Sequence, residues 1–103
     1  MPLSPVPGNS QPSSSLEAIR SYLSLALRLG APAYSLGDHR GAYEVYACTA
    51  RLILSGVKGA DEERQTLREA LTQCCTEVDV NEQAWIMRRA FDAVLGETAS
   101  TTR

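Results

Sequence analysis

Apolar residues recur at intervals of three and four along four segments of this chain, with polar residues between them. This spacing places apolar side chains on one face of an α-helix, so it predicts four amphipathic helices. The first is expected to begin at Ser14 and to end at Gly30 and Pro32, because glycine suits a helix C-cap and proline lacks an amide hydrogen. Its predicted buried face comprises Leu16, Ile19, Leu23, Ala26 and Leu27, widened by Tyr22, Leu25 and Leu29.

The other three helices have capping residues near their predicted ends. Asp38 is the expected N-cap of the second helix, which Gly56 closes, and Asp61 begins the third. Asp79 begins the fourth helix, with Asn81 as a competing cap, and Gly96 ends it. The predicted core positions are Ala42, Val45, Tyr46, Thr49, Leu52 and Ile53 in the second helix, Leu67, Ala70, Leu71, Cys74 and Val78 in the third, and Ala84, Met87, Ala90, Phe91, Val94 and Leu95 in the fourth.

No alternating run bounded by turn residues predicts a β-strand. The short connections favour antiparallel neighbours, so the expected fold is all-α, either a compact four-helix bundle or two stacked antiparallel helical hairpins. Residues 1–13 are rich in proline and serine and are expected to form a flexible N-terminal arm. The helical domain is predicted at 14–96, followed by a frayed C-terminal tail at 97–103.

Composition and charge argue against several classes of function. The 103 residues carry a net charge of −2, and the ten Lys and Arg are scattered, so no basic patch for nucleic acid is visible. The longest apolar stretch, 22–33, is too short to insert into a membrane, and the N-terminus lacks the features of a secretory signal. Three cysteines, two of them adjacent, fit free thiols in a reducing compartment, so a cytoplasmic location is expected.

Small residues and one aromatic ring are spaced in a familiar way around the corner between the first two helices. They are Leu29-Gly30, Gly37-Asp38, Ala42 and Tyr46. Through them, residues 26–54 resemble a single helical hairpin of the tetratricopeptide repeat family. The resemblance implies that the small residues let two helices cross closely and that the aromatic ring fills the groove between them. Pro32 stands where the family continues its first helix, and the second half of the chain does not repeat at the family's period.

The same corner concentrates side chains that are typical of protein interfaces. Tyrosine combines a large apolar body with a polar tip, which suits it to recognition. We expect Tyr34 and Tyr43 to be exposed and functional, and Tyr22 and Tyr46 to be structural. The predicted partner-binding residues are Tyr34, Asp38, His39, Tyr43 and Trp85.

Two functions remain open at this point. The first is a non-enzymatic protein–protein interaction or assembly module, which would bind a protein partner or associate with itself. The alternative is a small-molecule-binding regulatory domain with a pocket between the first two helices, lined by Tyr22, Tyr34 and Tyr46.

Neither function includes a catalytic residue, a metal site or a cofactor. A single histidine has no second histidine with which to hold a metal, and no Cys-x-x-Cys motif is present. The three cysteines are expected to behave as small core residues. Arg88 and Arg89 diverge on a helix, so both are expected on a solvated face.

Overall fold

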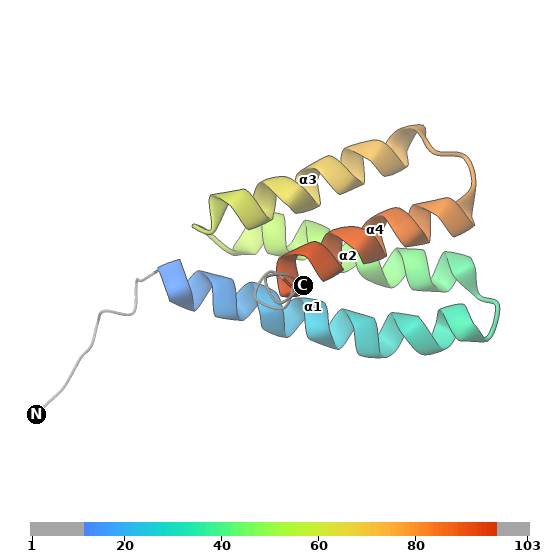
Figure 1. Cartoon of the computed structure of the whole chain (residues 1–103), viewed down its shortest axis with the longest axis horizontal. Coiled ribbons are helices and arrows are strands. Elements are labelled where there is room, and N and C mark those ends of the chain that lie inside the picture. The colour runs from blue at the N-terminus through green and yellow to red at the C-terminus, as the bar shows by residue number, and fades with distance from the viewer. Residues whose placement is uncertain (1–11, 97–103) are drawn as a thin grey trace, which may run out of the picture.

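The computed structural model describes residues 12–96, and this part of the chain consists of four α-helices without a β-strand (Figure 1). They are α1 (Pro12–Ser35), α2 (His39–Gly56), α3 (Asp61–Thr76) and α4 (Val80–Leu95). The predicted all-α fold is therefore confirmed. The predicted arm at 1–13 overlaps the described residues only at its last two positions, which are helical, and the predicted tail at 97–103 lies outside them.

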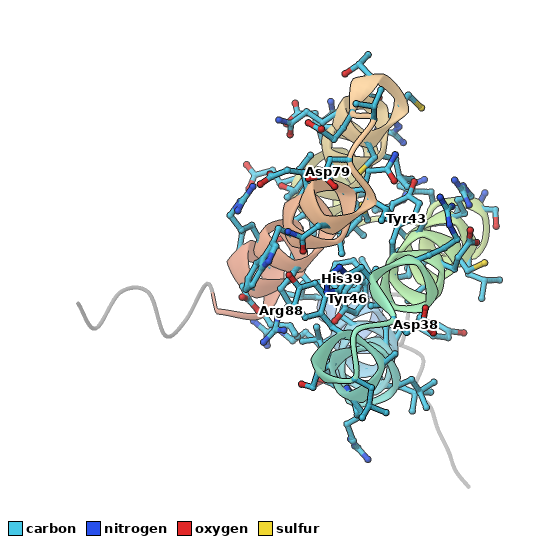
Figure 2. All side chains as sticks on the ribbon, turned by 90° about the vertical axis from the view of Figure 1, so that its right-hand side faces the viewer. Asp38, His39, Tyr43, Tyr46, Asp79 and Arg88 are labelled. Atoms are coloured by element: carbon cyan, nitrogen blue, oxygen red, sulfur yellow. The ribbon has the colours of Figure 1, made fainter. Side chains whose placement is uncertain are left out.

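The helices form a four-helix bundle in which α2 is central. α1 and α2 make one antiparallel hairpin and α3 and α4 make another (Figure 1). α2 packs against all three other helices, and α4 also contacts both α1 and α3. The end-on view shows α1 and α3 at opposite edges of the molecule, with α2 and α4 between them (Figure 2). In cross-section the bundle is thus a rhombus whose short diagonal joins α2 and α4.

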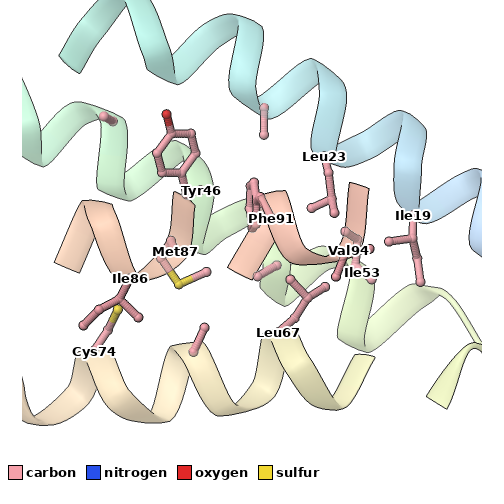
Figure 3. Packing of buried hydrophobic residues seen from close by; sticks show 14 residues of the cluster. Ile19, Leu23, Tyr46, Ile53, Leu67, Cys74, Ile86, Met87, Phe91 and Val94 are labelled. Carbon is pink, nitrogen blue, oxygen red and sulfur yellow. The ribbon is translucent and has the colours of Figure 1, made fainter. Parts of the chain in front are cut away.

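The core is built from apolar side chains of all four helices (Figure 3). Its largest members are fully buried, and the Tyr46 ring meets Phe91 edge-on with centroids 5.3 Å apart. Among residues 15–96, whose burial is described, the buried residues include no polar or charged type. The labelled core residues of Figure 3 are Ile19, Leu23, Tyr46, Ile53, Leu67, Cys74, Ile86, Met87, Phe91 and Val94.

Local capping begins α2 and α4 where the sequence predicts. The Asp38 carboxylate accepts a hydrogen bond from the Gly41 amide at 2.9 Å, and the Asp79 carboxylate accepts one from the Asn81 amide at 3.2 Å. Each satisfies a backbone N–H that the helix itself leaves without a partner. Gly96 is the C-cap of α4, as expected.

The predicted end of α1 is wrong, because the helix continues through Gly30 and Pro32 to Ser35. Gly30 is buried against the Tyr46 ring rather than placed at a cap. Beyond it, Ala33 and Tyr34 pack against the core. This packing keeps the last turn helical despite a proline, which costs about 3 kcal/mol in a helix interior.

Part of the predicted core is also wrong. Tyr22, Leu25 and Leu29 are exposed, although their spacing predicted that they lie on the buried face of the first helix. Leu52 and Val78 are exposed as well. The three α1 residues are exposed because this helix lies at the edge of the bundle, where α2 and α4 cover only one side of it. Among the described residues, no helix has the combined length and apolarity needed to cross a membrane.

Candidate functional site

Three aromatic rings gather where α1 ends and α2 begins. The rings of Tyr34 and His39 are stacked with centroids 4.3 Å apart, and Trp85 of α4 meets Tyr34 edge-on at 5.7 Å. The Trp85 indole N–H donates to the Tyr34 hydroxyl at 2.6 Å, and that hydroxyl donates to the Asn81 side-chain oxygen. The sequence-predicted residues Tyr34, His39 and Trp85 are therefore brought together, and the hydrogen bonds join the end of α1 to α4.

A small open cleft lies beside these rings, between α1 and α4, with Tyr46 of α2 contributing to its lining. Its volume is about 90 Å³, room for a few water molecules or for the tip of one side chain. Ligand pockets for small molecules are larger, at about 300–1,000 Å³. We call it the aromatic cleft, and its lining residues are Ala31, Tyr34, Ser35, Tyr46, Ala84, Trp85 and Arg88.

Arg88 brings the single formal charge among these lining residues. Its guanidinium Nε lies 3.6 Å from Asp92 Oδ1, one helical turn further along α4, and its side chain is 36% exposed. The same guanidinium lowers the pKa of the Tyr46 hydroxyl, although burial outweighs it and leaves that pKa raised. A solvated position was predicted for both arginines. This is confirmed for Arg89, whose side chain is 64% exposed, whereas Arg88 is only partly exposed and lines the cleft.

The remaining predicted partner-binding residues lie outside the cleft. The Asp38 carboxylate caps α2, so its hydrogen-bonding capacity is partly used within the fold. Tyr43 is on the side of α2 that faces α3 (Figure 2), where burial is the main cause of its raised pKa and the nearby Cys74 adds to it. Tyr34 and Tyr43 are both half-buried against the core, so their expected exposure is wrong.

The alternative set of pocket residues is also divided. Tyr34 and Tyr46 line the aromatic cleft, whereas Tyr22 is not among its lining residues. Tyr46 is 1% exposed and structural, as expected. Tyr22 was expected to be structural too, but it is 45% exposed.

Comparison of the chain with protein-family models, with curated proteins and with solved structures gave no match. The tetratricopeptide-like character of residues 26–54 therefore stays a resemblance in sequence pattern. What the aromatic cleft can do follows from its geometry alone.

Three residues of the cleft, Ala31, Ser35 and Arg88, were missed or misassigned from the sequence. Arg88 lies one helical turn after Ala84, and Trp85 is next to Ala84, so these positions share one side of α4. That spacing was the available signal for Arg88. No signal in the sequence indicated Ala31 or Ser35, because both follow Gly30, where the first helix was predicted to end.

A second surface feature is a row of exposed apolar side chains on α1. Tyr22, Leu25 and Leu29 are about half exposed, and Leu36 follows directly after the helix, 87% exposed. The Leu36 amide donates to the Pro32 carbonyl at 3.0 Å, which continues the helical spiral by one residue. We call these four residues the α1 stripe.

The cysteines are not a shared chemical site. Only Cys74 is buried, whereas Cys48 and Cys75 are exposed, so the expectation of three core cysteines is wrong. Burial is the main cause that raises the pKa of the Cys74 thiol to about 11, so this thiol is protonated at neutral pH. No group of three or more metal-ligating side chains occurs among residues 12–96.

Proposed function

We propose that this protein is a non-enzymatic interaction module whose aromatic cleft holds one side chain of a partner protein. The supporting observation is that Tyr34, Trp85 and Arg88 line one small open cleft. Tyrosine, tryptophan and arginine are the three residue types most enriched where protein interfaces concentrate their binding energy. The cleft volume of about 90 Å³ suits a single inserted side chain.

The cleft is organised before any partner binds. The stacked Tyr34–His39 pair and the hydrogen bond from Trp85 to Tyr34 hold two of the lining rings in place. A partner would therefore not have to order these side chains, which is one of the main costs of association.

The lining also defines the chemistry of the partner. The aromatic rings offer apolar contact, and Arg88 offers N–H donors and a positive charge at one edge. We infer an apolar anchor residue with a carboxylate close to it in the partner sequence, because guanidinium and carboxylate pair well in partly dehydrated sites.

The cleft can be tested by selecting a displayed peptide library on the immobilised chain. Trp85 is the only tryptophan, so its fluorescence reports directly on the cleft when a selected peptide is titrated in. Arg88→Ala is expected to weaken peptide binding at least about tenfold, equivalent to about 1.4 kcal/mol. Arg89→Ala is the matched control, since this neighbouring arginine is not among the lining residues of the cleft, and it should change the affinity less than about twofold.

Three results would contradict the proposal. They are the selection of no binding peptide, peptides that leave Trp85 fluorescence unchanged, and equal affinity for the Arg88→Ala and Arg89→Ala chains. A small molecule released in stoichiometric amount on denaturing the purified protein would instead favour the small-ligand function.

A further inference from the structure

We propose that the α1 stripe is the contact surface for a second copy of this chain, with the two α1 helices side by side and antiparallel. This interface is separate from the aromatic cleft. It would make the protein a two-fold symmetric dimer.

The spacing of the stripe is that of a helix–helix seam. Tyr22, Leu25, Leu29 and Leu36 follow one another at intervals of three, four and seven residues, and the exposed Pro32 occupies the place between Leu29 and Leu36. This is the alternating three- and four-residue spacing of the apolar positions at which two helices pack along their length. The core positions Leu23, Ala26 and Gly30 form a different row, so the stripe is not a continuation of the core.

The stripe lies on a helix with few charged residues, and the other helices of the bundle do not cover it. Over its 24 residues the helix carries only three charged side chains, Glu17, Arg20 and Arg28. Figure 1 shows α1 along one edge of the molecule, and the other three described helices all lie on the same side of α1. Contiguous exposed apolar surface of this kind marks interaction sites in proteins.

The exposed area is of the size that a dimer needs. From their exposed fractions of 45%, 51%, 59% and 87%, the four side chains leave on the order of 500 Å² exposed in each copy. Two stripes that covered each other completely would therefore remove about 1,000 Å² from water, which is the lower limit for a specific interface.

The stripe is also complementary to itself. When two α1 helices run antiparallel about a two-fold axis near Leu27, Leu25 lies opposite Leu29 of the second copy, and Tyr22 lies opposite its Pro32. In the same register Leu36 lies opposite Ala18 of the second copy, so every stripe residue faces an apolar residue, and the two-fold axis repeats each contact. A two-fold contact needs this property, because the same patch must serve on both sides.

The experiment measures the mass of the full chain by sedimentation velocity across a dilution series. The unsubstituted chain is expected to reach twice the chain mass. Leu25→Glu and Leu29→Lys should each be monomeric at the concentrations where the unsubstituted chain is dimeric, because each would bury a lone charge against leucine. Val78→Glu is the control, an equally abrupt change at an exposed apolar residue of the α3–α4 connection, and it should stay dimeric.

Mixing the two charge variants tests the antiparallel arrangement and excludes misfolding. In a mixed pair the new carboxylate faces the new ammonium group at one contact, and leucine faces leucine at the other, so a heterodimer should form. A variant that had merely unfolded could not be rescued in this way. A monomeric unsubstituted chain, a dimer that survives both substitutions, or failure of the mixture to pair would overturn the proposal.

Discussion

At the scale of single residues, Gly30 shows how one close approach is built into the fold. It lies where α1 crosses α2, and a Cβ atom there would be 2.5 Å from Cε1 and 2.8 Å from Cζ of Tyr46. Phe91 packs against the Tyr46 ring, which is fully buried and cannot move aside freely. Glycine is therefore required for space, since its backbone is ordinary helix.

Gly30→Ala should lower the free energy of unfolding by about 1–3 kcal/mol, the usual cost of overfilling a core. Urea denaturation followed by circular dichroism measures it. Gly56 provides the control, because no atom lies within 4 Å of its added Cβ. Gly56→Ala should be neutral or stabilise by up to about 1 kcal/mol. Equal stabilities for the two variants would show that the Tyr46 ring yields easily.

At the scale of elements, α1 keeps a proline one turn from its end. Pro32 cannot donate to the Arg28 carbonyl, so one hydrogen bond of the helix is missing there. The turn that follows nevertheless supplies Tyr34, which stacks on His39 and accepts from Trp85. The contacts of this last turn thus compensate for a locally unfavourable residue.

Pro32→Ala should raise the free energy of unfolding by about 1–2 kcal/mol, because it restores the hydrogen bond at a small cost in unfolded-state entropy. Thermal unfolding at fixed protein concentration measures the change. Ser24→Ala, at an exposed position of the same helix, should stay within about 0.5 kcal/mol of the unsubstituted chain. A less stable Pro32→Ala chain would mean that the proline supports this turn.

The elements also show what could be predicted from the sequence. The starts of α2 and α4 were predictable because Asp38 and Asp79 cap them through hydrogen bonds within three residues. The end of α1 was not, since its last turn is held by contacts of Tyr34 with His39 and Trp85, which belong to other helices.

The same limit applies to the candidate site. Tyr34 and Trp85 could be singled out by residue type, since tyrosine and tryptophan are enriched at interfaces, and His39 by its place in the corner before α2. Arg88 lines the aromatic cleft because α4 lies beside the end of α1. Tyr43 does not line it, because its side of α2 faces α3. No local pattern determines which helices become neighbours.

At the scale of the whole molecule, the bundle encloses groups that would lose a proton at high pH. Burial raises the pKa values of Cys74, Tyr46 and Tyr43, with Cys74 moving from its ordinary 9.0 to about 11. The Cys74 thiol is also close to the Gln83 carbonyl, at 3.5 Å, as a donor. The folded chain therefore holds these protons more tightly than the unfolded chain does.

Stability should consequently fall as the pH rises from about 9 to about 11. Below this window both states keep the Cys74 proton, and within it the unfolded chain releases the proton first, which favours unfolding. Urea denaturation at a series of pH values measures the slope. Cys74→Ala should flatten the part of the slope that belongs to the thiol. A slope of opposite sign, or one unchanged in this variant, would contradict the assignment.

The separation of α1 from α3 governs how the molecule can come apart. Because these two helices sit at opposite edges, either one can detach while the other three helices keep contacts among themselves. α2 cannot detach in this way, since each of the other three helices would then lose contacts with a neighbour. Partial opening therefore requires the least free energy at α1 or α3. Separation of α2 from α4 is equivalent to global unfolding.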